Sequence, residues 1–196
     1  PLAGLPASAV AVAANPTVNL VSGQNIESKT LTQIIRDLDS RTLENVREEI
    51  QKGILSGETA TAITRQATAI VQTRTSQQVE AVVRTYINAV SAEAMQQVAS
   101  TNRQLLSGMK WLSVLDKRTT PVCQARDGKI YPIGSSIRPP AHFRCRSVFE
   151  MVVKPEYRVP DQTRTRSAMD GPVSEKVDYE KWLRDQPEDV QREVLK

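Results

Sequence analysis

The two cysteines and the single histidine of this chain all lie in one short segment. Cys123 is followed by eighteen residues, then His142, two more residues and Cys145. Because chance would scatter three rare residues over 196 positions, their concentration indicates that residues 111–146 are organised around them. His142 and Cys145 can converge on one point from a tight turn, and the preceding segment is long enough to return Cys123 to that point.

Three interpretations of these side chains are open. The first is a structural zinc site, because thiolates and an imidazole are three of the ligands that tetrahedral zinc takes. Asp116 is the candidate fourth ligand, and a small module with a thin core gains stability from a metal. The second is a disulfide between Cys123 and Cys145, which forms in oxidising surroundings. The third is a pair of buried thiols beside a hydrogen-bonded imidazole.

The same segment resembles a known family. Its motif is an aromatic residue, an Asp-x-Arg-Thr group, a cysteine, an Asp-Gly turn and a Pro-Pro-x-His-x-x-Cys-Arg group, here Trp111, Asp116, Arg118, Thr119, Cys123, Asp127, Gly128, Pro139, Pro140, His142, Cys145 and Arg146. This motif is similar to that of the Mu protein F-like minor head proteins of tailed phages, and weaker similarity extends it to roughly residues 60–196. Many members have further cysteines where Thr120 and Ser147 stand here.

The resemblance implies a minor capsid protein that takes part in head morphogenesis. Such a protein would be made in the bacterial cytoplasm and would lie in the virion, inside the head near the portal. It would bind the portal or capsid protein and assist head assembly and genome packaging or ejection. The resemblance also implies structural roles for the motif residues other than the metal ligands, namely Trp111, Arg118, Thr119, Asp127, Gly128, Pro140 and Arg146.

Elementary chemistry favours structural roles for several of these residues. Asp116 can cap a turn and pair with Arg118 or Arg146, which we prefer to a catalytic role. Trp111 and Trp182 are interpreted as core residues, because large aromatic side chains bury the most apolar surface.

Positive charge is concentrated on the motif. Residues 110–158 hold ten basic and four acidic residues, whereas residues 1–109 hold nine of each. A basic surface of this kind attracts phosphate without reading sequence, so weak, non-specific DNA binding is predicted. The candidate DNA-binding residues are Arg118, Arg126, Lys129, Arg138 and Arg144.

The fold class predicted is mainly α with a small α+β C-terminal module: an elongated helical bundle followed by a Cys/His β-hairpin knuckle. Apolar residues recur at helical spacing from Ser28 to Ile54, from Ala60 to Ile70 and from Thr75 to Ser107. We divide the chain into four parts. An extended or disordered arm covers residues 1–26, and a helical bundle covers residues 27–108. A Cys/His motif module covers residues 109–153, and a linker with C-terminal helices covers residues 154–196. The thin bundle is expected to be oligomeric or bound to a partner.

Enzymatic activity is not expected. With one histidine, a chain that commits His142 to a metal has no imidazole left as a general base. The alternative function is a metal-dependent nuclease or a toxin-like effector built on the Cys/His module. No stretch of eighteen apolar residues occurs, so no membrane anchor is expected.

Overall fold

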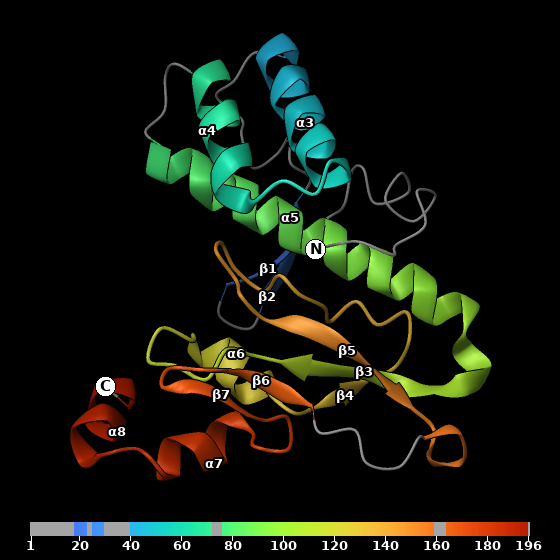
Figure 1. The fold of residues 1–196 in the computed structure, drawn as a ribbon, viewed down its shortest axis with the longest axis vertical. Helices are drawn as coiled ribbons and strands as arrows, with labels where there is room; N and C mark the ends of the chain where they lie inside the picture. Colours follow the sequence, from blue (N-terminus) through green and yellow to red (C-terminus); the bar gives the residue numbers. More distant parts are fainter. Residues whose placement is uncertain (1–17, 23–24, 30–39, 72–75, 159–163, 196) are drawn as a thin grey trace. The chain divides into compact units, whose positions relative to one another are not determined.

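The computed structural model describes residues 18–22, 25–29, 40–71, 76–158 and 164–195 (Figure 1). About half of this described part is helical, and a small antiparallel sheet lies in the C-terminal part. The chain divides into two compact units. The first unit comprises residues 1–98 with 136–145, and the second comprises residues 99–135 with 146–196.

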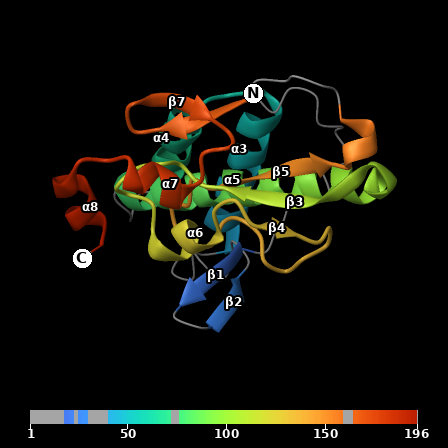
Figure 2. The ribbon, with the colours of Figure 1, turned by 90° about the horizontal axis from the view of Figure 1, so that it is seen from below.

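The first unit contains a two-stranded antiparallel ladder, β1 (Val18–Ser22) and β2 (Asn25–Lys29), which Figure 2 shows in blue. The helix predicted to start at Ser28 does not start there, because Ser28 is part of β2 and pairs with Asn19. The two short runs Val18–Ser22 and Asn25–Lys29 contain Val and Ile and are separated by Gly-Gln, which is typical of a hairpin. Strand pairing therefore takes the place of the helical start predicted at Ser28. An arm was predicted for residues 1–26. Of these, residues 1–17, 23 and 24 lie outside the described residues.

Three helices form the core of the first unit: α3 (Ser40–Leu55), α4 (Ala60–Ile70) and α5 (Ser76–Thr101). Helix α5 crosses α3 and α4, and apolar side chains of all three meet (Figure 1). Gly53 allows close packing of α3 on α4, because a Cβ built at this position would lie 2.5 Å from Ile63 Cγ1. The buried cluster consists of Val46, Ile50, Ile54, Ile63, Ala67, Val71, Val79, Val82, Val83, Tyr86 and Val90.

Helix α5 is shorter than the sequence predicted. It ends at Thr101, and a short 3₁₀ turn, η1 (Arg103–Leu105), leads directly into strand β3 (Leu106–Leu112). The apolar residues after Asn102 continue the helical spacing, so the sequence predicts a helix up to Ser107. The same short run also fits a strand. Pairing of β3 with two other strands decides in favour of the sheet, since strand pairing supplies hydrogen bonds that a sequence pattern does not reveal.

The sheet of the second unit has the strand order β4 (Ile130–Tyr131), β3, β5 (Val148–Val153), and Figure 2 shows β3 between its two neighbours. Both pairings are antiparallel, and Trp111 lies opposite Phe149. The Trp111 ring makes edge contacts with the rings of Tyr131 and Phe149, at centroid distances of 6.3 and 5.8 Å. Trp111 is completely buried, so the prediction that it is a core residue is confirmed.

The chain between β3 and β4 differs from the predicted hairpin. It contains a helix, α6 (Pro121–Arg126), which the prolines of this region had obscured. Proline is well tolerated in the first helical turn, where Pro121 lies, because the missing N–H has no partner there in any case. Asp127 and Gly128 therefore end a helix rather than form a two-residue hairpin turn, and the φ of Gly128, 75°, is typical of such an end.

The linker predicted at the start of residues 154–196 contains secondary structure that was not expected. After the 3₁₀ turn η2 (Pro155–Tyr157), strands β6 (Thr165–Ala168) and β7 (Gly171–Ser174) form an antiparallel hairpin. The Asp170-Gly171 dipeptide, in which Gly171 begins β7, was the available hairpin signal.

Two short helices end the described chain, as predicted: α7 (Tyr179–Arg184) and α8 (Glu188–Val194), separated at Pro187. Trp182 is 4% exposed and packs with Leu115 and Tyr179, so its assignment as a core residue is also confirmed. Among the described residues, no helix is long and apolar enough to cross a bilayer.

Candidate metal centre and motif network

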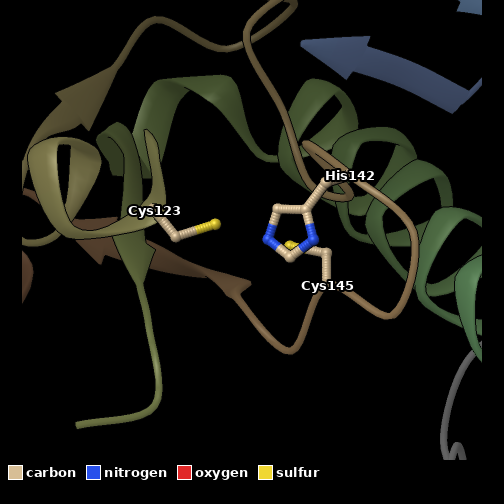
Figure 3. Close-up of side chains that lie close together, drawn as sticks. All are labelled: Cys123, His142 and Cys145. Atoms are coloured by element: carbon tan, nitrogen blue, oxygen red, sulfur yellow. The ribbon is translucent and has the colours of Figure 1, made fainter. Parts of the chain in front are cut away.

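The two cysteines and the histidine lie together, as the sequence predicted. One ligand atom from each of Cys123, His142 and Cys145 lies within 4.8 Å of the other two. Figure 3 shows the imidazole close to both sulfur atoms, with one ring nitrogen turned toward the sulfur of Cys123. Neither cysteine forms a disulfide, and both are buried, at 1% and 4% exposure. This set of two sulfur donors and one nitrogen donor could hold a metal ion, and soft donors of this kind suit zinc.

The tautomer of His142 fits ligation. Its Nδ1 lies 2.8 Å from the carbonyl oxygen of Phe143, and a carbonyl can only accept a hydrogen bond. Nδ1 therefore carries the proton and donates, so Nε2 is the unprotonated nitrogen, which is the state that metal ligation requires. Histidine ligands of metals commonly have their second nitrogen fixed in this way.

Local structure places each of the three side chains. Cys123 lies on α6, whose backbone N–H groups at Cys123 and Gln124 both donate to the Thr120 carbonyl. His142 and Cys145 lie on one turn, closed by a 3.2 Å hydrogen bond from Cys145 N–H to the His142 carbonyl. The turn contains Arg144 in the left-handed region, with φ of 57°.

Asp116, the predicted fourth ligand, is not among the grouped donors. Arg146 donates to both of its carboxylate oxygens, at 2.5 and 2.7 Å, and the Arg118 backbone N–H and Thr119 Oγ1 add bonds of 3.0 and 3.2 Å. The sequence-based pairing of Asp116 with Arg146 is therefore confirmed. Ligation of a metal by Asp116 would compete with its ion pair to Arg146, which uses both carboxylate oxygens.

This environment also affects ionisation. Burial works against the charged form of Asp116, but the hydrogen bond and positive charge of Arg146 outweigh it and lower the pKa of this carboxyl. Burial, followed by the nearby charge of Asp116, raises the pKa of Tyr179 to about 12. Tyr179 therefore remains a neutral phenol at ordinary pH, and its hydroxyl donates to the Asp116 carbonyl at 2.9 Å.

Asp127 and Arg166 form a buried ion pair that sequence analysis did not predict. Their side chains are 1% and 4% exposed, and both Arg166 Nη atoms donate to the Asp127 carboxylate. Asp127 also accepts the backbone N–H groups of Ser113 and Tyr179, at 2.7 and 2.8 Å. Arg166 further donates to the carbonyls of Ser113 and Val177. Asp127, the aspartate of the Asp-Gly turn, is thus hydrogen-bonded to the residue after β3, to β6 and to the start of α7.

The five predicted DNA-binding residues differ in their environments. Arg138 pairs with Glu93 at 2.8 Å, and Arg144 donates to the Gln77 carbonyl at 2.7 Å with Glu80 3.9 Å away. Arg126 lies over the Trp111 ring, 5.1 Å from its centroid. The remaining two, Arg118 and Lys129, are exposed. Partial neutralisation of Arg138 and Arg144 makes the exposed pair the better candidates for phosphate contact.

A comparison with protein families gives one match, to the model of the Phage Mu protein F like protein family over residues 44–150. No curated protein and no solved structure matches the chain. The matched span covers more than half of the sequence and runs from within α3 to within β5. It includes the three grouped metal donors and the Asp116–Arg146 pair. The chain belongs to the Phage Mu protein F like family.

Proposed function

We propose that this protein is a minor component of a tailed-phage head, bound to the portal or to the inner capsid, where it assists head assembly and genome packaging or ejection. Family membership carries this proposal, because the family suggests a phage head morphogenesis protein. The network of the motif residues supports a structural role, since Asp127, Arg146 and Trp111 are all engaged in packing or ion pairs within the protein.

The helical unit is proposed as the partner-binding element. Leu55, the last residue of α3, is 65% exposed, so this unit presents a large apolar side chain to solvent. Exposed large apolar side chains on a thin bundle favour self-association or binding to another protein.

Co-expression with the portal and major capsid proteins of a tailed phage encoding this chain tests the proposal. We expect the full chain to co-elute with the portal or capsid protein, and we expect Leu55→Asp to weaken this association. Leu195→Asp is the matched control, because Leu195 is also largely exposed, at 74%, but lies in the other unit. A chain that remains a compact monomer and binds neither protein would overturn the proposal.

Zinc is proposed as a structural cofactor of this protein, held by Cys123, His142 and Cys145. When bound, it would link these donors and stabilise the motif segment. The donor set supports this, because two buried thiols and an Nε2 lone pair are grouped within 4.8 Å. The metal-dependent nuclease or effector remains the alternative function. A general base for this alternative lacks support, because the only histidine of the sequence would serve as a metal ligand.

Purified protein is expected to contain about one zinc per chain. Chelation should make both thiols reactive and lower the melting temperature, because the binding free energy of a structural metal contributes to folding. Metal analysis combined with thiol titration checks this. Metal-free protein with two titratable thiols and a melting temperature that a chelator does not change would exclude the zinc site.

Weak binding to duplex DNA is a further prediction. With about three to five phosphate contacts, log K should fall by roughly three to five units per decade of salt, without base preference. Gel shifts at low and high salt measure this dependence. Arg118→Glu and Lys129→Glu should each weaken binding, whereas Arg184→Glu, a change at an exposed i,i+4 pair with Glu180, should not. Binding that is insensitive to salt would contradict the prediction.

A further inference from the structure

We propose that Thr85 and Asn88 on α5 are positioning residues for the turn that carries His142 and Cys145. They would hold the turn backbone in the conformation that presents both metal donors. This inference rests on the proposed zinc site and assigns part of its construction to a helix that contributes no ligand.

The first observation is a pair of hydrogen bonds from one face of α5. Thr85 Oγ1 accepts the Arg144 backbone N–H at 3.0 Å, and Asn88 Nδ2 donates to the Cys145 carbonyl at 2.7 Å. Residues three apart on a helix lie on the same face, so both side chains can reach one turn. The two bonds hold the peptide group that precedes Arg144 and the peptide group that follows Cys145.

The second observation is that this turn has an unfavourable backbone conformation. Arg144 has a φ of 57°, which residues with a Cβ seldom adopt without support from their surroundings. Its N–H is the group that Thr85 accepts. The hydrogen bond from α5 therefore acts on the residue whose conformation sets the direction of Cys145 relative to His142.

The third observation concerns the hydroxyl of Thr85. This side chain is 1% exposed, and its hydroxyl donates to the Ala81 carbonyl at 2.6 Å, which leaves its oxygen to accept from Arg144. Burial of a hydroxyl is unfavourable unless it is hydrogen-bonded, and valine would fill the same space. A helix core alone does not require threonine at this position, whereas the turn does.

Two further contacts hold the same segment to α5 without touching the ligand residues. Arg138 pairs with Glu93, and the Arg144 guanidinium donates to the Gln77 carbonyl. Residues 136–145 are thus bound along α5 from Gln77 to Glu93, and they belong to the same compact unit as that helix up to Val98. Within this arrangement, the bonds of Thr85 and Asn88 are the ones adjacent to the ligands.

Zinc affinity of the full chain, measured by competition with a chromophoric chelator, tests the inference. Thr85→Val and Asn88→Asp should each lower zinc affinity by about 10- to 100-fold, the usual effect of removing support around metal ligands. Thr85→Ser keeps the hydroxyl and should retain affinity close to that of the unchanged protein. The visible spectrum of the Co²⁺-loaded protein should change in the two defective variants, because the donors would move relative to one another.

Thr64→Val is the matched control. Thr64 is 7% exposed on α4 and donates to the Ala60 carbonyl at 2.7 Å, so this change removes the same kind of helix bond. It should leave zinc affinity unchanged. Circular dichroism of every variant separates a loss of metal affinity from a loss of the helices.

The outcomes distinguish the two proposals. If the unchanged protein binds no zinc, the zinc site itself is excluded and the inference falls with it. If the unchanged protein binds zinc and Thr85→Val behaves like Thr64→Val, the zinc site stands and the positioning role is overturned. Should Thr85→Val fail to fold, Asn88→Asp decides, because equal affinity in that variant alone contradicts the inference.

Discussion

Replacing Arg166 with methionine is expected to destabilise the second unit by about 3–5 kcal/mol, because it leaves a buried carboxylate without its counter-charge. The Asp127 and Arg166 side chains are 1% and 4% exposed, so water cannot solvate the carboxylate that remains. The substitution also removes the donors to the Ser113 and Val177 carbonyls. Chemical denaturation followed by far-ultraviolet circular dichroism measures the loss.

Arg164→Met is the control for this prediction. Arg164 lies two residues away and pairs with Glu150 at 2.8 Å, but its side chain is 47% exposed. Exposed pairs of this kind contribute about 0–1 kcal/mol, so the control should remain close to the unchanged protein. Adding Asp127→Asn to Arg166→Met should recover part of the stability, since the double variant no longer contains an unpaired buried charge. Equal stability of the Arg166 and Arg164 variants would show that the buried pair is unimportant.

The sequence allowed the metal donors to be identified because rarity is visible without a structure. The chain has two cysteines and one histidine, and the prediction that they meet needed only their spacing and residue types. The ion pair of Asp116 with Arg146 was predictable because the motif offers few basic partners for this carboxylate. Arg118 and Arg146 were the two candidates, and the structure has Arg146.

Arg166 and Thr85 could not be assigned from the sequence, because their roles depend on tertiary contacts. Arg166 is one of 26 basic residues, and nothing local indicates that it pairs with Asp127, 39 positions away. Thr85 bonds to Arg144 across 59 positions. The hydrogen bond to the Arg144 N–H explains why a threonine stands at this position.

The errors in secondary structure have a common cause. The C-terminal end of α5, the helix α6 and the hairpin β6–β7 are segments whose local sequence does not determine their secondary structure, because they are short or carry few apolar residues. Their outcome depends on partners distant in sequence, such as the pairing of β3 with β5 across the Cys/His segment. Longer periodic segments, such as α4, and the proline that separates α7 from α8 were predicted correctly.

Trp111→Ala is expected to cost about 3–5 kcal/mol of unfolding free energy, because it removes the largest fully buried side chain of the protein's described part. Both neighbouring rings, Tyr131 and Phe149, would lose their edge contacts with the indole. The indole N–H also donates to Ser113 Oγ at 3.1 Å, and the loss of this donor removes one partner of a buried hydroxyl.

Trp111→Phe separates the packing contribution from the hydrogen bond. It keeps an aromatic ring between Tyr131 and Phe149 but removes the N–H, so its cost should be smaller than that of alanine. Denaturant unfolding followed by circular dichroism gives both values, and fluorescence of the remaining Trp182 reports separately on the cluster around α7. A loss below about 1 kcal/mol for alanine would mean that the sheet does not depend on this ring, since buried aromatic-to-alanine changes otherwise cost several times more.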